Sequence, residues 1–241
     1  FRVKDAAGAF REALRRGAKP IEAKAGPMEL NIPGIEGIGG LNVYLVDRYG
    51  ARSIYDVDFE PIPDADRDKN AAGLTYLDHL THNLRRGNMA VWADYYERIF
   101  NFREIRYFDI EGKLTGLVSK AMTSPCGKIR IPLNESQDDK SQIEEFIARY
   151  NGEGIQHIAL GTSDIYSTVE TLRRRGVPFQ STPDSYYEKV EARVGAHGED
   201  LERLHRNNIL IDGAPTKGQG LLLQIFTHDA IGPIFFEIIQ R

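Results

Sequence analysis

The sequence predicts an α+β protein built from repeated units, each with one strand, one helix and about three further strands. Two stretches, residues 1–20 and 158–178, show the same succession: an apolar strand, an Asp, an amphipathic helix with a basic end, a Gly and a Pro. Asp commonly caps the start of a helix, and Gly commonly follows its last turn. A third copy lies between these two stretches. We therefore expect a duplicated fold whose sheet stays open on one side.

The first unit is short and ends in a polar stretch. Asp5 should cap its helix, and a Gly and a Pro after the helix should open the next strand. The expected strand, helix and two further strands lie at residues 1–3, 6–14, 28–32 and 41–46. The polar stretch at residues 64–70 is the best boundary candidate, on composition alone.

The middle unit carries the clearest helix signals. Asn88 can cap the helix start, and Asn101 can take the left-handed conformation that ends it. The expected strand, helix and three strands lie at residues 77–80, 89–100, 103–109, 115–121 and 128–132. A wide apolar face on this helix favours core packing over subunit contact; its members are Trp92, Tyr95, Tyr96, Ile99 and Phe100.

The third unit follows a linking helix at residues 141–150. Its own helix should begin after Asp164 and run over residues 165–172. A helical insertion is expected between Asp184 and Asn208. The strands of this unit are expected at residues 158–160, 209–212, 221–227 and 234–240.

Composition narrows the class of protein. The net charge is −4, with 31 Lys and Arg against 35 Asp and Glu, so a nucleic-acid partner is not expected. A single cysteine, Cys126, cannot form an internal disulfide. No apolar run approaches the roughly 20 residues of a membrane span. These features predict a soluble globular protein without a membrane role.

Both ends of the chain fall on expected strands, residues 1–3 and 234–240. Domains rarely begin and end on bare strands, because open edges invite aggregation. We therefore expect flanking segments beyond both ends.

Two of the six histidines occupy matched positions. His79 and His157 fall on the first strands of successive units, 157 − 79 = 78 residues apart. If the two units pair about a pseudo-twofold axis, both imidazoles can meet at one point. Glu237 lies in an apolar run, where a carboxylate is costly to bury unless it is paired or bound to metal; a salt bridge to Arg241 is the alternative. The other four histidines are interpreted as solvated residues of loops or the insertion: His82, His197, His205 and His228.

Two His and one carboxylate on one face of a metal leave three positions open. That donor set suits non-haem Fe(II) that binds a chelating substrate and O₂. Zn²⁺ can use the same donors but more often keeps a tetrahedral site. The residue pattern alone leaves open both a metal site and ordinary structural histidines.

Four motifs add a family resemblance. Residues 77–83, 151–159, 222–227 and 235–241 occur in the order found in 4-hydroxyphenylpyruvate dioxygenases, and the chain resembles the bacterial form of that family throughout. The resemblance implies the vicinal-oxygen-chelate (glyoxalase/bleomycin-resistance-like) fold, in which β-α-β-β-β units form half-open barrels. Residues 1–65 would be the second half of a metal-free N-terminal domain. Residues 73–241 would be the catalytic metal-binding domain of two units, lacking the family's C-terminal lid helix, on which substrate closure and activity depend.

The same resemblance implies roles for individual residues. By position, His79, His157 and Glu237 would be the iron ligands. Five polar residues would act in catalysis and contact the substrate: Ser119, Asn134, Gln142, Gln156 and Gln224. Phe226 and Phe235 would form aromatic walls around the substrate.

The implied activity is that of an Fe(II)-dependent dioxygenase. It would convert 4-hydroxyphenylpyruvate and O₂ to homogentisate in tyrosine and phenylalanine catabolism, by oxidative decarboxylation, ring hydroxylation and side-chain migration. The resemblance also implies a cytoplasmic homo-oligomer. The alternatives are hydroxymandelate synthase, which oxidises the benzylic carbon of the same substrate, an extradiol- or glyoxalase-type enzyme, and a metal-free small-molecule-binding protein on the same fold.

Overall fold

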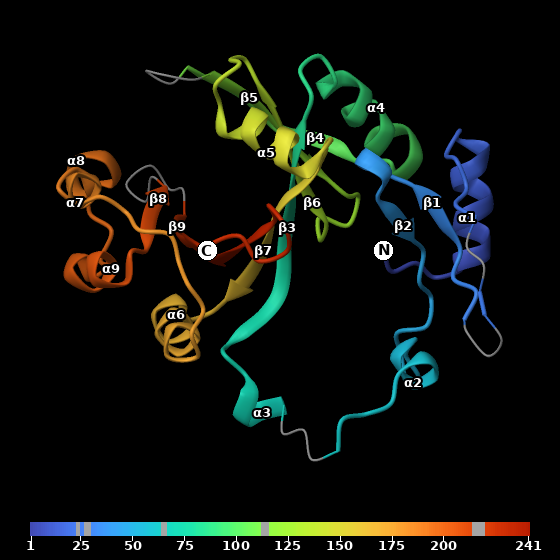
Figure 1. Cartoon of the computed structure of the whole chain (residues 1–241), viewed down its shortest axis with the longest axis horizontal. Helices are drawn as coiled ribbons and strands as arrows, with labels where there is room; N and C mark the ends of the chain where they lie inside the picture. Colours follow the sequence, from blue (N-terminus) through green and yellow to red (C-terminus); the bar gives the residue numbers. More distant parts are fainter. Residues whose placement is uncertain (23–24, 27–29, 64–66, 112–115, 214–219) are drawn as a thin grey trace.

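The computed structural model describes residues 1–22, 25–26, 30–63, 67–111, 116–213 and 220–241. Its centre is one mixed eight-stranded sheet with the order β4-β5-β6-β3-β7-β10-β9-β8 (Figure 1). The first half contains β3 (Leu74–Leu84), β4 (Arg103–Glu111), β5 (Gly116–Thr123) and β6 (Arg130–Ser136). The second half contains β7 (Gly154–Thr162), β8 (Leu210–Gly213), β9 (Leu221–Phe226) and β10 (Phe235–Gln240).

The two halves repeat the same topology, as the sequence predicts. In each half the last strand runs parallel to the first, β6 beside β3 and β10 beside β7, and the other two strands continue outward. The halves join where β3 and β7 pair antiparallel. This pairing of the first strands is the pseudo-twofold contact expected from the duplication, and it brings the two matched histidines onto neighbouring strands.

One helix from each half covers the same face of the eight-stranded sheet. α4 (Met89–Phe100) has the predicted bounds and ends at Asn101, whose φ is 56°. α6 (Ile165–Arg174) begins where Asp164 accepts a hydrogen bond from the Ser167 amide. Apolar side chains of the strands pack beneath them in two clusters, which include Leu84, Ile131 and Leu133 under α4 and Ile225 and Ile238 under α6. Because side chains alternate across a strand, the opposite face is left for the residues between them.

The remaining helices extend these layers. α5 (Gln142–Tyr150) links the halves and begins at Ser141, whose hydroxyl accepts from the Glu144 amide. The predicted insertion forms three short helices, which lie at the far left of Figure 1: α7 (Asp184–Tyr187), α8 (Val190–Val194) and α9 (Leu201–Asn207). Their buried residues join the cluster beneath α6. Among the described residues, no helix is both long and apolar enough to cross a bilayer.

The first unit is smaller; its α1, β1 and β2 lie at the right of Figure 1, and α2 and α3 lie along the lower edge of the view. Its elements are α1 (Ala6–Arg15), β1 (Gly34–Glu36), η1 (Ile38–Gly40), β2 (Asn42–Tyr44), α2 (Tyr55–Asp58) and α3 (Arg67–Asn70). β1 and β2 form a two-stranded antiparallel sheet. Asp5 caps α1 as predicted, by accepting from the Gly8 amide.

Two strand predictions in this unit are wrong. Residues 1–3 make only a single bridge, Arg2 to Val46, instead of a strand. Of the strand expected at residues 28–32, residues 28 and 29 lie outside the described part and residues 30–32 form no strand. β1 begins only after Pro33, which has no amide hydrogen to give to a ladder. Residues 64–66 of the boundary stretch also lie outside the described part, and residues 67–70 form α3.

Candidate metal centre

Three donor atoms from three adjacent strands meet at one point. His79 Nε2 lies 3.1 Å from Glu237 Oε2 and 3.3 Å from His157 Nε2, and His157 Nε2 lies 3.3 Å from the same carboxylate oxygen. His79 is 9% exposed and Glu237 is 2% exposed. These three residues are also the group of potential metal ligands found within the described ranges. The structure therefore brings together the triad that the sequence singles out.

The strand register explains why the three side chains meet. Ala159 on β7 lies opposite His79 on β3 and opposite Glu237 on β10. Residues directly opposite one another share a face of the sheet, as do residues two apart along a strand. His157 lies two residues before Ala159 and therefore joins the same face. The side chain of Ala159 at the centre is a single methyl group, which leaves room for the donors around it.

A bulge before each histidine sets the orientation of its ring. Leu77 and His79 on β3 lie opposite two consecutive residues of β7, Leu160 and Ala159. Asp78 therefore has no partner on β7 and forms the bulge. On β7 the corresponding extra residue is Gln156, just before His157. Bulges re-aim side chains at functional sites. His79 Nδ1 lies 2.8 Å from Asp78 Oδ1, and His157 Nδ1 lies 3.0 Å from Gln156 Oε1.

This arrangement fits a metal ion. With the proton of each Nδ1 donated to the neighbouring oxygen, each Nε2 is the nitrogen that can bind a metal at the point that Glu237 also faces. Burial alone would lower the pKa of His79, but its hydrogen bonds with Asp78 and Glu237 raise the pKa to about 9. Burial alone would raise the pKa of Glu237, but the two histidines hold it below its ordinary value. Two imidazole nitrogens and one carboxylate oxygen form a donor set that transition metals use.

A cleft of about 390 Å³ opens beside the triad. Its lining includes His157 and four residues that the family resemblance assigned to the substrate pocket: Gln142, Gln156, Phe226 and Phe235. Phe235 stacks on His157, with ring centroids 5.2 Å apart, and Phe226 meets the same ring edge-on at 5.9 Å. Cavities of roughly 300–1,000 Å³ are typical of small-molecule sites.

The other three assigned residues lie outside the described lining of this cleft. Ser119 on β5 lies opposite Asn134 on β6, and Gln224 lies two residues before Phe226 on β9. Strand alternation places all three on the same face of the sheet as the triad. These three residues therefore lie on the same face of the sheet as the triad but do not line the cleft.

Two buried polar residues on these strands were not among the site residues expected from the sequence. Asp78 is 1% exposed and binds His79. Asn83 is fully buried opposite Asn134, and neither polar atom of its amide has a hydrogen-bond partner among the described residues. Asp78 could have been found from the sequence, because it directly precedes His79 just as Gln156 directly precedes the matched His157. A buried amide such as Asn83 gives no comparable signal in the sequence.

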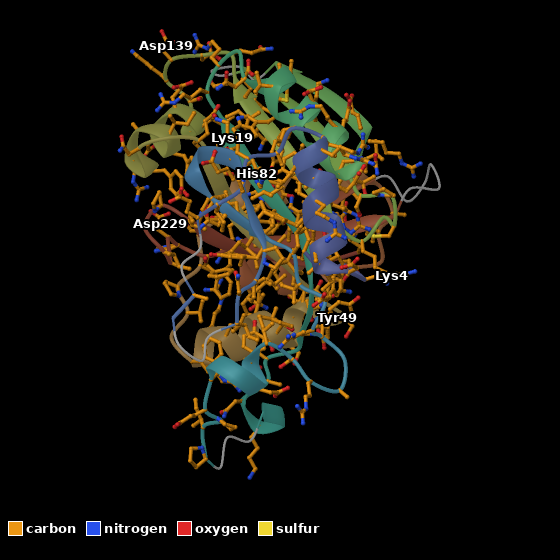
Figure 2. The ribbon with its side chains drawn as sticks, turned by 90° about the vertical axis from the view of Figure 1, so that its right-hand side faces the viewer. Lys4, Lys19, Tyr49, His82, Asp139 and Asp229 are labelled. Atoms are coloured by element: carbon orange, nitrogen blue, oxygen red, sulfur yellow. The ribbon has the colours of Figure 1, made fainter. Side chains whose placement is uncertain are left out.

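The interpretation of His82 as a solvated residue is wrong. His82 lies on β3, is 2% exposed and hydrogen-bonds with the Tyr96 hydroxyl at 2.7 Å. Figure 2 shows it in the interior, whereas Lys4 and Asp139 lie at the periphery. The expected strand covered residues 77–80, but pairing with β7 extends β3 to Leu84 and turns His82 toward α4. Burial lowers the pKa of His82 to about 4.

The structure also shows the surroundings of the other three histidines and the ion-pair partner of Arg241. His205 and His228 are exposed, as expected, and His205 lies 2.9 Å from Asp184. His197 is half-buried and accepts a hydrogen bond from the Glu199 amide. Arg241 pairs with Asp78 and leaves Glu237 to the histidines, so the alternative of a Glu237–Arg241 salt bridge is not what forms.

Comparison with known proteins identifies relatives of this chain. A family model described as hydroxyphenylpyruvate dioxygenase, N-terminal, matches residues 1–60, and one described as the glyoxalase/bleomycin resistance protein/dioxygenase superfamily matches residues 76–202. The 4-hydroxyphenylpyruvate dioxygenase of Pseudomonas aeruginosa is 67% identical over 241 residues, covering 100% of this chain and 67% of the relative. The hemolysin VllY of Vibrio vulnificus is 66% identical, covering 100% of this chain and 68% of the relative.

A solved structure shows the same architecture. A mutant of 4-hydroxymandelate synthase from Streptomyces coelicolor superposes with a TM-score of 0.81 at 26% identity, covering 100% of this chain and 69% of that one. The duplicated sheet and the His-His-Glu group thus define a protein of the vicinal-oxygen-chelate class. Within that class, the chain belongs to the 4-hydroxyphenylpyruvate dioxygenase family, whose members are dioxygenases acting on a small molecule.

Proposed function

We propose that this chain catalyses the Fe(II)-dependent conversion of 4-hydroxyphenylpyruvate and O₂ to homogentisate and CO₂. The observation that carries the proposal is the convergence of His79, His157 and Glu237 beside a cleft walled by two phenylalanines. The identity of 67% to a 4-hydroxyphenylpyruvate dioxygenase supports the choice of substrate.

His79, His157 and Glu237 would hold the iron. The donor set is two neutral nitrogens and one anionic oxygen, which suits Fe(II) in an oxygenase and leaves positions for a 2-oxo acid and O₂. When bound, Fe(II) supplies the activation of O₂, with the 2-oxo acid providing electrons through its decarboxylation. The chain's own contribution is to fix these three donors and to shape the cleft next to them.

The cleft residues would orient the substrate. Phe226 and Phe235 present apolar faces that suit a phenol ring and limit water near the reacting atoms. The amides of Gln142 and Gln156 can both donate and accept, so they can hold the phenol hydroxyl or the keto-acid group. Ser119, Asn134 and Gln224 share the triad's face, and we assign them to the same polar lining.

The domain assignment is part of the proposal. All three donors lie within residues 73–241, which supports that segment as the catalytic domain. We assign residues 1–65 to the N-terminal domain that the family resemblance implies.

A second function is favoured by one observation. The mutant of 4-hydroxymandelate synthase covers the whole chain with a TM-score of 0.81. A synthase of this kind would oxidise the benzylic carbon instead of the ring. The 26% identity to that structure, against 67% to a dioxygenase, favours ring hydroxylation.

The test is anaerobic loading of the chain with Fe(II), followed by O₂ and 4-hydroxyphenylpyruvate. Mass spectrometry and NMR should identify homogentisate, and 4-hydroxymandelate as the product would overturn the assignment. His79→Ala and Glu237→Ala should each lose iron and activity together. His228→Ala, at an exposed position, is the matched control and should keep both. Stoichiometric iron in either triad variant would contradict the ligand assignment.

A further inference from the structure

The two matched histidines have different partners on their Nδ1 atoms. Asp78 and Gln156 are equivalent residues, 78 positions apart, and each is the bulged residue before its histidine. His79 faces a carboxylate at 2.8 Å, whereas His157 faces a neutral amide oxygen at 3.0 Å. The duplicated units have therefore diverged at a position that acts directly on the ring, and only one of them carries an anion there.

Asp78 forms ion pairs with two arginine side chains, one from β6 and one from the residue after β10. Arg130 of β6 donates to Asp78 Oδ2 at 3.0 Å. Arg241, directly after β10, donates to both carboxylate oxygens at 3.2 and 3.1 Å. Asp78 itself is 1% exposed, and a carboxylate so buried requires such partners. The Asp78 carboxylate thus links β3, which carries His79, to β6 and to the end of β10, which carries Glu237.

We propose that Asp78 is a positioning residue for the metal centre, acting through His79. This inference rests on the proposed function, because it concerns the same metal. By accepting the Nδ1 proton, Asp78 fixes the tautomer in which His79 Nε2 is free for the metal, and it holds that nitrogen 3.1 Å from Glu237 Oε2. Arg241, which contacts both carboxylate oxygens, keeps the carboxylate in place. The negative partner makes His79 a stronger ligand than His157.

A purely structural role for Asp78 gives different expectations. If Asp78 only ties strands together, its loss would lower stability and leave metal affinity of the folded chain unchanged. If Asp78 orients His79, its loss weakens metal binding in a chain that still folds. Arg130→Gln provides the matched control, because it removes one partner of Asp78 without touching the contact to His79.

The experiment measures Co(II) binding to the whole chain, by anaerobic titration against a competing chelator and by the visible ligand-field bands. Asp78→Ala should lower affinity about 10- to 100-fold and shift these bands. Asp78→Asn, which keeps an acceptor but loses the charge, should fall between Asp78→Ala and wild type. Arg130→Gln should retain affinity within about threefold of wild type, as expected for a partner that does not contact the ring.

A second readout uses the wild-type chain and needs no stable Asp78 variant. In Zn(II)-loaded protein with ¹⁵N-labelled histidine, His79 should be bound through Nε2 and carry its proton on Nδ1, with the Nδ1–H resonance shifted downfield and lost in His79→Gln. Metal binding through His79 Nδ1, or unchanged affinity and bands in Asp78→Ala, would overturn the proposal. Failure of wild-type protein to bind Co(II) or Fe(II) would instead overturn the proposed function, so the two failures are distinguishable.

Discussion

Ala159 lies directly opposite Glu237 where β7 and β10 pair, and it lies opposite His79 on its other side. It is fully buried at the centre of the face that carries the donors. A larger side chain there would occupy the space that the two imidazoles and the carboxylate share. The smallness of this residue is therefore a condition for the three donors to meet.

We predict that Ala159→Leu abolishes metal binding. The extra carbons would force the donors apart, and overpacking of this kind also costs about 1 to 3 kcal/mol of unfolding free energy. Ala93→Leu, at a buried position of α4 away from the donors, is the control for overpacking alone. Metal content after anaerobic loading and urea unfolding separate the two effects. Full metal content in Ala159→Leu would contradict this view of the site.

The helices and the duplication could be predicted from sequence because their signals are local. The middle helix has the predicted bounds, and Asn101 ends it in the left-handed conformation as predicted. The expectation that Asn88 caps its start is wrong: the Asn88 side chain donates to Glu153 instead, and Glu135 accepts from the Met89 amide. Strand ends could not be predicted in the same way, because pairing decides them: β3 continues to Leu84 along β7, and this buries His82. The same pairing creates the bulge at Asp78, which no local pattern shows.

The metal triad could be predicted from the residues alone, whereas the pocket residues could not. Matched placement of His79 and His157, with the isolated charge of Glu237, indicated the triad from the residues themselves. The pocket residues came only from family resemblance, and the structure lines the cleft with Gln142, Gln156, Phe226 and Phe235. The roles of the pocket residues remain predictions.

The first unit contacts the second half of the sheet through Gly39. Its φ is 58°, and a Cβ built there would lie 1.8 Å from the Glu153 carbonyl oxygen. Gly39→Ala should therefore lower the unfolding free energy by more than about 2 kcal/mol, from backbone strain and displacement of Glu153 together. Gly40→Ala is the matched control: its φ is 85°, but a Cβ would meet nothing within 4 Å. Equal losses in the two variants, measured by urea unfolding, would show that the contact with Glu153 contributes nothing.

Gln142 is expected to act on the substrate and not on the metal. It is the first residue of α5 and lines the cleft, while the triad lies on strands. Loss of one hydrogen bond costs about 1 to 3 kcal/mol, so Gln142→Ala should raise KM by roughly 5- to 150-fold. Lys140→Ala, at a nearby exposed residue, should leave KM unchanged. Iron content should equal that of wild type in both variants, and loss of iron in Gln142→Ala would contradict its assigned role.

His82 should make the fold sensitive to mild acid. Its pKa is about 4 in the folded chain because burial disfavours the charged ring, against 6.5 for the unfolded residue. The unfolded chain therefore binds the proton first, and the stability contribution, complete above pH 6.5, is lost as the pH falls toward 4. By linkage, His82 accounts for about 2 kcal/mol of unfolding free energy lost between pH 7.5 and 5.

Other groups titrate in the same range, so the informative quantity is the difference between variants. His82→Leu removes the titration, and its unfolding free energy should fall by about 2 kcal/mol less than that of wild type over this interval. The variant also leaves the Tyr96 hydroxyl without its partner, which lowers stability at every pH and does not affect the slope. His228→Gln, at an exposed histidine, should keep the wild-type slope. Urea unfolding at both pH values measures each slope, and an unchanged slope in His82→Leu would mean that His82 does not remain neutral in the folded protein.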